Sequence, residues 1–300
     1  MKPILLFVSF FLLCIYTNAQ ISLKTEYMGT SSYRDDDTNE KIGDSKGSAI
    51  VYQGNINIPL SMKMNERNQP TAWSINTGAS YVSLKNKNFT EDLVSDEIMN
   101  GYLGITHMRP ISNKWSLILS LGAGVYSPTT NVSKITSKHI LGNGCAIFVC
   151  NVRPNLQLGG GLAVNNSFGY PMAFPAMYLN WNTDGLFQVN ISMADGLNMS
   201  AGYNLNKYMC TSLIFEMNGQ MSLLEKDGKD MMFTHQYMIG GGRLNFKIAD
   251  KISIPLTVGV NCMRIGMYKK RTLKAMFSDQ PGGYFQASPY IAAGIAINFK

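Results

Sequence analysis

Hydrophobic and polar residues alternate at almost every step of the segment NINIPLSMK, residues 55–63. Its apolar positions are Ile56, Ile58, Leu60 and Met62. Its polar positions are Asn55, Asn57, Ser61 and Lys63. Because successive side chains of a β-strand point to opposite faces, this pattern predicts a strand that separates an apolar environment from a polar one.

The same alternation recurs in segments spread over the whole chain. It is found in residues 115–125, 187–193, 213–223, 252–261 and 291–299. In the first of these segments, Leu119 and Leu121 share one face while Ser120 takes the other. A period of two over segments of about ten residues is the signature of transmembrane β-strands, weak in one segment and persuasive in many.

A soluble β-sandwich or propeller would also alternate, so the lengths of the connections have to decide. Tight, turn-rich connections fall at residues 65–70, 109–114, 153–155, 182–185, 204–207 and 249–251. Between them lie mostly longer polar stretches at 31–46, 86–97, 128–139, 224–231 and 265–283, with shorter links near 166–172 and 194–196. Short turns on one rim and long loops on the other are typical of an outer-membrane barrel.

Counting the segments between these connections predicts an all-β fold, a closed antiparallel transmembrane β-barrel of about fourteen strands. The expected strands are 20–30, 47–63, 71–85, 97–109, 115–127, 140–152, 156–165, 173–182, 186–193, 197–204, 208–223, 232–248, 252–264 and 284–299. An even number places both termini on the short-turn side. A twelve-strand barrel, with 186–193 and 197–204 as an inserted hairpin, is the alternative.

The first nineteen residues read as a cleaved secretory signal peptide. Lys2 precedes an apolar run, and Thr17-Asn18-Ala19 offers the small residues that a signal peptidase requires. We expect the mature chain to begin near Gln20 and to form one barrel domain over residues 20–300, located in the outer membrane. Mean hydropathy near zero fits this expectation, because only one face of each strand has to be apolar.

The last strand, SPYIAAGIAINFK, alternates up to Phe299, and Lys300 follows this aromatic residue. Together with the turn RPISNKW and the segment GYPMAFPAMYLNWN, it resembles functionally uncharacterised outer-membrane barrel proteins of Gram-negative bacteria. The resemblance implies a barrel read by the assembly machinery through its C-terminal strand. It implies no catalytic or binding residues.

Charge and cysteine content narrow the chemistry. The net charge is +7, but the basic residues are scattered, so we expect no nucleic-acid partner. The cysteines of the mature chain are Cys145, Cys150, Cys210 and Cys262, and their spacing is not that of a metal site. We expect no cofactor and no metal. A bridge between Cys145 and Cys150 stays open, and Asp35, Asp36 and Asp37 are interpreted as a solvated loop.

By parity, one set of polar side chains would face the lumen: Asn55, Asn57, Lys63, Asn76, Gln188, Asn190, Glu216, Gln220, His235, Arg243 and Asn261. The leading hypothesis is a passive or weakly selective pore for small solutes, with Lys63, Glu216 and Arg243 setting ion preference. The alternative is a structural or interaction barrel with a filled lumen, in which these groups pair with one another. A lipid hydrolase built on a serine and His107 or His235 is less favoured. Expected partners are outer-membrane lipids, lipopolysaccharide and the barrel assembly machinery.

Overall fold

The computed structural model describes residues 19–67, 69–166, 169–183, 185–193, 196–272 and 282–299. The predicted signal peptide, residues 1–19, lies outside these residues except for Ala19. The strands are β1 Gln20–Asp35, β2 Lys41–Met64, β3 Pro70–Lys87, β4 Glu97–Pro110, β5 Trp115–Ser127, β6 Ile140–Arg153, β7 Leu156–Asn165, β8 Met172–Thr183, β9 Phe187–Ser192, β10 Leu197–Asn206, β11 Met209–Lys226, β12 Lys229–Ala249, β13 Ile252–Lys270, β14 Gly283–Phe285 and β15 Ser288–Asn298. Two single-turn 3₁₀-helices, Val132–Lys134 and Ser137–His139, lie between β5 and β6.

In the described part of the chain, no helix has the length and apolar character needed to cross a bilayer.

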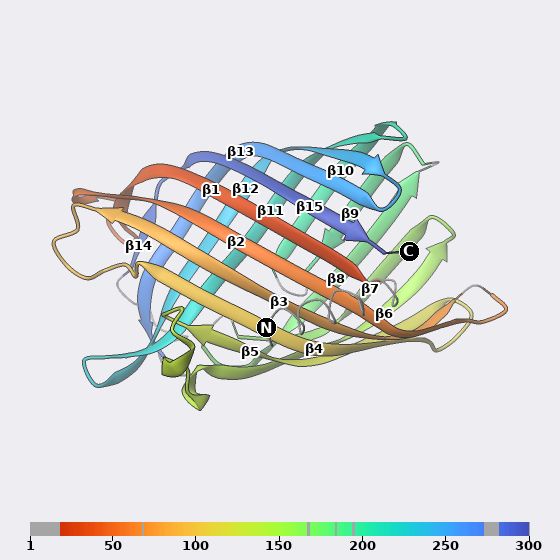
Figure 1. The fold of residues 1–300 in the computed structure, drawn as a ribbon, viewed down its shortest axis with the longest axis horizontal. Helices are drawn as coiled ribbons and strands as arrows, with labels where there is room; N and C mark the ends of the chain where they lie inside the picture. The colour runs from red at the N-terminus through yellow and green to blue at the C-terminus, as the bar shows by residue number, and fades with distance from the viewer. Residues whose placement is uncertain are drawn as a thin grey trace, which may run out of the picture.

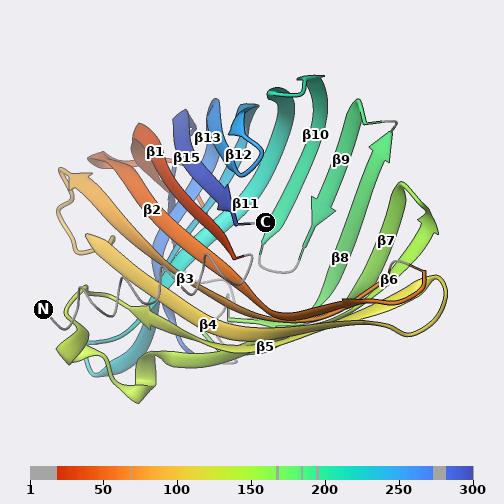
Figure 2. The ribbon, with the colours of Figure 1, turned by 45° about the vertical axis from the view of Figure 1, so that its right-hand side comes forward.

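All the strands belong to one antiparallel sheet that closes on itself (Figures 1 and 2). The first strand β1 pairs with β15, from Gln20 opposite Asn298 to Met28 opposite Tyr290. Strands β14 and β15 both lie between β13 and β1, so they occupy one position of the ring. The barrel therefore has fourteen strand positions, as the alternation predicts. The twelve-strand alternative is wrong, because β9 and β10 pair on both sides as members of the wall.

Several strands run further than the sequence predicts. The loop expected at 224–231 is a turn of two residues, Asp227 and Gly228, because β11 and β12 stay paired up to Lys226 opposite Lys229. Asp227 and Gly228 have φ of 53° and 70°, the left-handed conformation that a two-residue hairpin turn requires. The strand expected at 284–299 is interrupted after Phe285, which gives β14 and β15.

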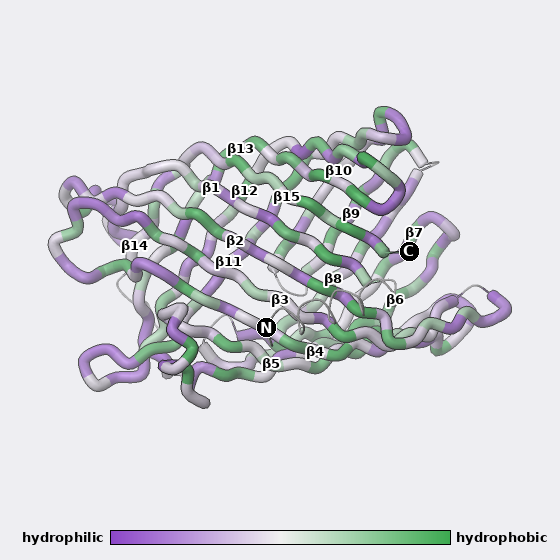
Figure 3. Tube along the Cα trace, viewed as in Figure 1, coloured by the Kyte–Doolittle hydropathy of each residue, from purple (hydrophilic) through white to green (hydrophobic). Residues whose placement is uncertain are grey.

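The outer surface of the ring carries an apolar belt. Leucine and valine side chains from six strands are between 55% and 72% exposed on it: Leu23, Leu103, Leu121, Leu162, Leu213 and Val258. Figure 3 shows hydrophobic and hydrophilic residues alternating along the strands, with hydrophilic residues gathered in the turns. Apolar residues exposed all around a closed barrel are stable in lipid and costly in water. The protein is thus a transmembrane β-barrel.

Aromatic side chains mark the rim that carries the short turns, here called the short-turn rim. Trp73, Trp115, Trp181 and Tyr208 are each 42% to 57% exposed close to these turns. Trp73 stacks on His107 at 4.1 Å between ring centroids, on the outer face. Aromatic rings at this level are typical of the border between lipid and water.

The interior of the barrel is divided because the hairpin of β11 and β12 folds inward at the opposite rim, the loop rim. Its tip packs against β4 and β5 rather than beside β10. The space between this hairpin and β1–β3, β13 and β14 is filled by a buried cluster that includes Met28, Val51, Val82, Phe233 and Phe285. We call this part the filled lobe. The rest of the interior holds a cavity.

Candidate functional site

A network of ionised side chains lies inside the barrel, next to the filled lobe. Arg243 Nη2 is 2.5 Å from Glu216 Oε1, and Lys24 Nζ is 3.4 Å from Glu216 Oε2. Lys24 also pairs with Glu26. The four side chains come from β1, β11 and β12, three strands that the ring brings together. Two of them, Glu216 and Arg243, are predicted lumen residues, and their charges compensate each other instead of facing an open path.

The carboxylate of Glu26 is fully buried and is the centre of this network. It accepts hydrogen bonds from the hydroxyl groups of Tyr237 and Tyr290, each at 2.6 Å, and from Gln53 Nε2 at 3.0 Å. Burial of a carboxylate is tolerated only when its lone pairs are occupied in this way. The arrangement therefore fixes β1, β2, β12 and β15 to one another through a single side chain.

Three more predicted lumen residues are buried. His235 has no exposed surface, and its Nδ1 lies 3.2 Å from Gln220 Oε1. Asn261 is also fully buried. Its amide can donate to the carbonyl oxygens of Met238 and Met263, which flank a register shift between β12 and β13. Asn261 thus satisfies backbone groups that the shift would leave unpaired.

The remaining interior contains a cavity of about 950 Å³. Its polar wall comes from β2–β6 and includes Asn55, Asn76, Ser80, Asn100, Ser120 and Asn143. The facing wall comes from β10–β13 and the link before β10. It carries the apolar Met193, Leu197, Met217, Met221, Met238 and Met263 together with the polar Asn218, Gln220, Thr234 and Gln236. Among the described residues that line the cavity, none is Asp, Glu, Lys, Arg or His.

Three of the predicted lumen residues, Asn55, Asn76 and Gln220, line the cavity, the first two on its polar wall. Asn55 accepts a hydrogen bond from the Tyr102 hydroxyl at 3.1 Å, and Asn76 donates to Thr106 Oγ1 at 2.8 Å. The half-buried Asn57 lies opposite Asn76 in the register of β2 and β3.

The remaining three predicted lumen residues lie away from the cavity. Asn190 accepts a hydrogen bond from Asn180 at 2.7 Å. Gln188 lies opposite Asn182, two residues further along the same pair of strands. Lys63 follows a register shift between Pro59 and Ser61, which places it opposite Thr71 on the side of the sheet that Trp73 occupies. An extra residue in one strand reverses the parity of all that follows, and parity alone cannot detect it.

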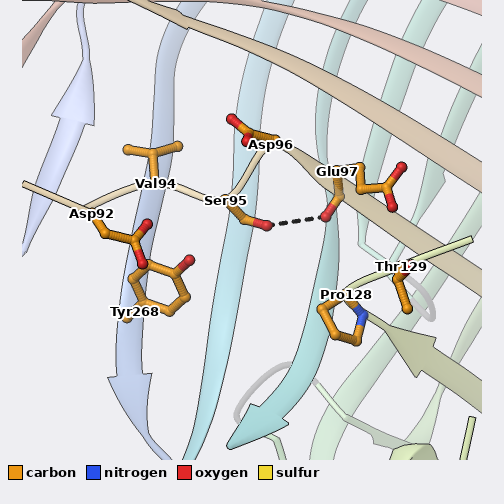
Figure 4. Close-up of a pocket in the computed structure, with 8 residues that line it drawn as sticks. All are labelled: Asp92, Val94, Ser95, Asp96, Glu97, Pro128, Thr129 and Tyr268. Carbon is orange, nitrogen blue, oxygen red and sulfur yellow. Dashed lines mark hydrogen bonds between the residues drawn. The ribbon is translucent and has the colours of Figure 1, made fainter. Parts of the chain in front are cut away.

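A second, shallower depression lies on the loop rim between the segment 92–97 and Pro128, Thr129 and Tyr268 (Figure 4). Its carboxylates already have partners. Asp92 pairs with Lys226 at 2.9 Å, Asp96 accepts from Asn86 at 3.3 Å, and Glu97 accepts from Tyr81 at 3.3 Å. In the described part of the chain, no group of three or more His, Cys, Asp or Glu residues is placed to hold a metal ion.

The cysteines and the remaining histidines are also placed. No disulfide joins Cys145, Cys150, Cys210 or Cys262, all within the described residues. Cys145 lines the cavity, whereas Cys150 lies opposite the exposed Trp115 on the outer face. His107 stacks on Trp73, and its Nδ1 lies 3.1 Å from Ala72 O.

Sequence reasoning missed the residue that shapes the cavity. Asn100 Nδ2 donates to Met221 O at 2.6 Å, and Met221 N donates to Asn100 Oδ1 at 3.2 Å. This one amide satisfies both backbone groups of Met221 and holds the β11–β12 hairpin inside the barrel. The parity of β4, with Asn100, Tyr102 and Thr106 on one face, was the available signal, since all three line the cavity.

Comparisons with known proteins give a family and a set of distant structures. The family described as "Domain of unknown function (DUF6268)" matches residues 15–298. No curated protein matches the sequence. The COG4313 outer membrane channel from Pseudomonas putida F1 is 8% identical, with a TM-score of 0.47, over 94% of this chain and 95% of that chain.

Two further solved structures are similar over most of their length. The translocator domain of autotransporter NalP from Neisseria meningitidis is 12% identical, with a TM-score of 0.38, over 94% of this chain and 88% of that chain. A Pseudomonas aeruginosa FadL homologue is 8% identical, with a TM-score of 0.30, over 94% of this chain and 91% of that chain. At these scores the likeness assigns no function.

Proposed function

We propose, for a chain that belongs to the family described as "Domain of unknown function (DUF6268)", a passive path for small uncharged solutes across an outer membrane. The observation that carries the proposal is a cavity of about 950 Å³, which has no Asp, Glu, Lys, Arg or His among its described lining residues. Its size is within the range of about 300 to 1,000 Å³ expected of a solute site. A charged solute would have to give up its hydration there without a compensating charge. An uncharged one would exchange water for amide and hydroxyl groups.

Charged side chains in the lumen would set no ion preference in this barrel. Glu216 is bound to Arg243 and Lys24, and both ion pairs lie beside the filled lobe rather than on the cavity wall. Compensated pairs present little net field to a passing ion. Passage, rather than catalysis, is the activity that an uncharged wall supports best.

The place of the protein is inferred from two features. A predicted signal peptide at residues 1–19 would export the chain, and a barrel with an apolar belt would then insert into the outer membrane. Outer-membrane lipids would surround the belt, lipopolysaccharide would contact the loop rim, and the barrel assembly machinery would insert the chain. The short-turn rim would face the periplasm.

Liposome swelling tests the path. Protein refolded from Gln20 onward is placed in liposomes, and the swelling rate is followed in an iso-osmotic pentose. We expect swelling well above that of protein-free liposomes, and slower swelling in an impermeant salt of equal osmolarity. The variant Asn143→Trp fills part of the cavity and should slow the pentose. Leu121→Trp, next to it across the β5–β6 pair but on the lipid side, is the matched control.

A folded barrel that fails to accelerate swelling would overturn the passage proposal. Folding is checked by the heat-dependent mobility of the barrel on an electrophoresis gel. In that case the filled, structural barrel would be the better description, because the interior network would then serve stability alone.

A further inference from the structure

The ring of Tyr102 lies along the polar wall of the cavity instead of standing up from it. Its hydroxyl donates to Asn55 Oδ1 at 3.1 Å. Tyr102 belongs to β4 and Asn55 to β2, and Gly78 on β3 lies between them in the register. The two strand intervals amount to about 10 Å. A tyrosine can bridge most of that distance only if its ring leans over β3, so one face of the ring rests on the wall and the other faces the cavity.

Gly78 provides the space for this orientation. A Cβ atom at Gly78 would lie 2.6 Å from Tyr102 Cε1, which is closer than two carbon atoms can approach. The ring therefore occupies the volume in which any other residue would place its side chain. Tyr102 is still 41% exposed, and it lines the cavity. An aromatic ring that is fixed at its hydroxyl end and exposed to an interior cavity offers a flat surface on which a ligand can stack.

An uncharged amide lies beside this ring on β3. Asn76 precedes Gly78 by two residues and therefore shares its inward face. Its Nδ2 donates to Thr106 Oγ1 at 2.8 Å, so the side chain leans towards β4. The amide thus lies next to the edge of the Tyr102 ring, and its oxygen is an acceptor for a ligand hydroxyl.

A second amide approaches the same place from the other side. Asn143 on β6 lies opposite Gly122 on β5, and Gly122 lies opposite Gly104, two residues from Tyr102 on β4. A Cβ atom at Gly122 would lie 2.8 Å from Asn143 Oδ1, so this side chain leans over β5 towards Gly104. Asn143 and Gly104 both line the cavity. A ligand above Gly104 would therefore meet an aromatic ring and two amides.

A neutral sugar in its pyranose form matches this combination. One face of a pyranose carries C–H groups, which stack on an aromatic ring, and its rim carries hydroxyl groups that both donate and accept hydrogen bonds. Each amide also offers donors and an acceptor, so it can bind such hydroxyls in either direction. The facing wall adds Gln220, Thr234 and Gln236.

Other uncharged solutes match only one of the two features. An aromatic hydrocarbon would stack on the ring, but it would displace water from the amides without replacing its hydrogen bonds, which costs free energy. An acyclic polyol would bind the amides, but it has no rigid apolar face for the ring. The cyclic sugar is therefore the class of solute that the wall favours.

We propose that Tyr102, Asn76 and Asn143 form a binding site for neutral pyranose sugars on the polar wall of the cavity. The sugar would stack on Tyr102, and its hydroxyl groups would bind the amides of Asn76 and Asn143. Asn55 is a positioning residue, because it holds the ring along the wall through the tyrosine hydroxyl. The site rests on the proposed function, since the cavity is taken as the place where the solute binds.

Saturation-transfer NMR tests the site, because it detects weak binding through the ligand protons that touch the protein. The barrel is refolded from Gln20 onward in a deuterated detergent. The ligands are methyl β-D-xylopyranoside, xylitol and phenol at equal concentrations, and micelles without protein give the background. We expect the xyloside to receive the strongest saturation, above all at its ring C–H protons, and xylitol to receive several-fold less.

Variants link the signal to the site. Tyr102→Leu keeps an apolar side chain but removes the ring, so the dissociation constant of the xyloside should rise about threefold to tenfold. Tyr102→Trp keeps a stacking surface and should retain binding. Asn143→Ala removes one hydrogen bond to the sugar and should weaken binding about threefold to tenfold. Tyr52→Leu is the matched control, because Tyr52 is 46% exposed and stacks on Tyr81 on the outer face.

Three results would overturn the sugar site. The first is equal saturation of the xyloside and xylitol. The second is an unchanged dissociation constant in Tyr102→Leu, with folding confirmed by heat-dependent mobility on a gel. The third is stronger saturation of phenol than of the xyloside that is lost in Tyr102→Leu, which would assign the ring to aromatic solutes.

These outcomes are separate from the swelling test. Binding of the xyloside without liposome swelling would leave a sugar site in a closed cavity and remove the passage. Swelling in the pentose without binding that depends on Tyr102 would leave a path that selects by size alone and remove the sugar site.

Discussion

The side-chain amide of Asn100 binds both the N–H and the C=O of Met221, at 3.2 Å and 2.6 Å, across the interior of the barrel. A neighbouring strand would normally supply these two bonds. One side chain therefore takes the place of a strand, and the β11–β12 hairpin is free to leave the wall. The division of the interior into a filled lobe and a cavity follows from this substitution.

Replacing Asn100 should loosen the hairpin. In Asn100→Ala, both backbone groups of Met221 lose their partner, at a cost of about 1–3 kcal/mol in the free energy of unfolding. The amide hydrogen of Met221 should exchange faster, as measured by hydrogen–deuterium exchange. Asn100→Asp keeps the acceptor but removes the donor, so it should give an intermediate rate. Unchanged exchange at Met221 in the alanine variant would contradict this account.

The Glu26 cluster should be sensitive to single hydroxyl groups. Tyr290→Phe removes one hydrogen bond to a buried carboxylate, which should lower the free energy of unfolding by about 1.5–3 kcal/mol in a urea titration of the reconstituted barrel. Tyr27→Phe is the matched control, because Tyr27 is 43% exposed on the outer face of the same strand as Glu26. Equal losses in the two variants would show that the buried network adds nothing specific.

Cys145 offers a chemical test of the path. It lines the cavity, whereas Cys150 on the same strand lies opposite Trp115 on the outer face. A small methanethiosulfonate reagent that reaches Cys145 should slow pentose uptake, and Cys145→Ser should abolish this inhibition. Cys150→Ser should leave it in place. Inhibition that survives in Cys145→Ser would mean that the reagent acts at another cysteine and that modification of Cys145 does not block the path.

The β1–β2 turn should respond to acid. Asp35 accepts hydrogen bonds from the backbone N–H of Thr38 at 2.8 Å, from its hydroxyl at 3.0 Å and from the N–H of Asp37 at 3.1 Å. These bonds, the Thr38 backbone bond first, hold the pKa of the exposed Asp35 carboxyl below its ordinary value. Because the carboxyl pKa is lower in the folded state, the ionised Asp35 stabilises the turn at pH values above the pKa of the unfolded state. This stabilisation is lost as the pH falls through the pKa of the folded state.

The measurement for this turn is the chemical shift of the Thr38 amide proton as pH is lowered. We expect its midpoint below that of an ordinary aspartate. Asp35→Asn should remove the transition, and Asp36→Asn should preserve it. A midpoint at the ordinary carboxyl pKa would contradict the hydrogen-bonded arrangement.

The strands themselves were predictable because a period of two survives in every wall segment, whatever the rest of the barrel does. The polarity of side chains such as Leu119, Ser120 and Leu121 is enough to predict which face of the sheet each one occupies. The fourteen strand positions and their order followed from that alternation and from the turns. The ends of the strands were harder to predict from the sequence, because continued pairing, as between Lys226 and Lys229, depends on the partner strand.

The divided interior was not predictable for a related reason. Leu213 and Met217 alternate in the same way, although one faces lipid and the other lines the cavity. Apolar residues suit both environments, so the pattern does not change where β11 leaves the wall. Lys63 could not be placed for a different reason. One extra residue in β2 moves its side chain to the other face of the sheet, and nothing in the sequence pattern signals this extra residue.

The hydrogen bond from Tyr290 to Glu26 joins residues 264 positions apart in the chain. It can form only when the last strand has reached the first, so closing the ring and completing the buried network are one event. Contacts of such long range are slow to form, because most of the chain must be ordered beforehand. A chain that stops before β15 would leave the Glu26 carboxylate without Tyr290 and the edge of β1 unpaired, and it would be a natural target for proteolysis during assembly. Only a chain that includes β15 can therefore complete both the ring and the buried network.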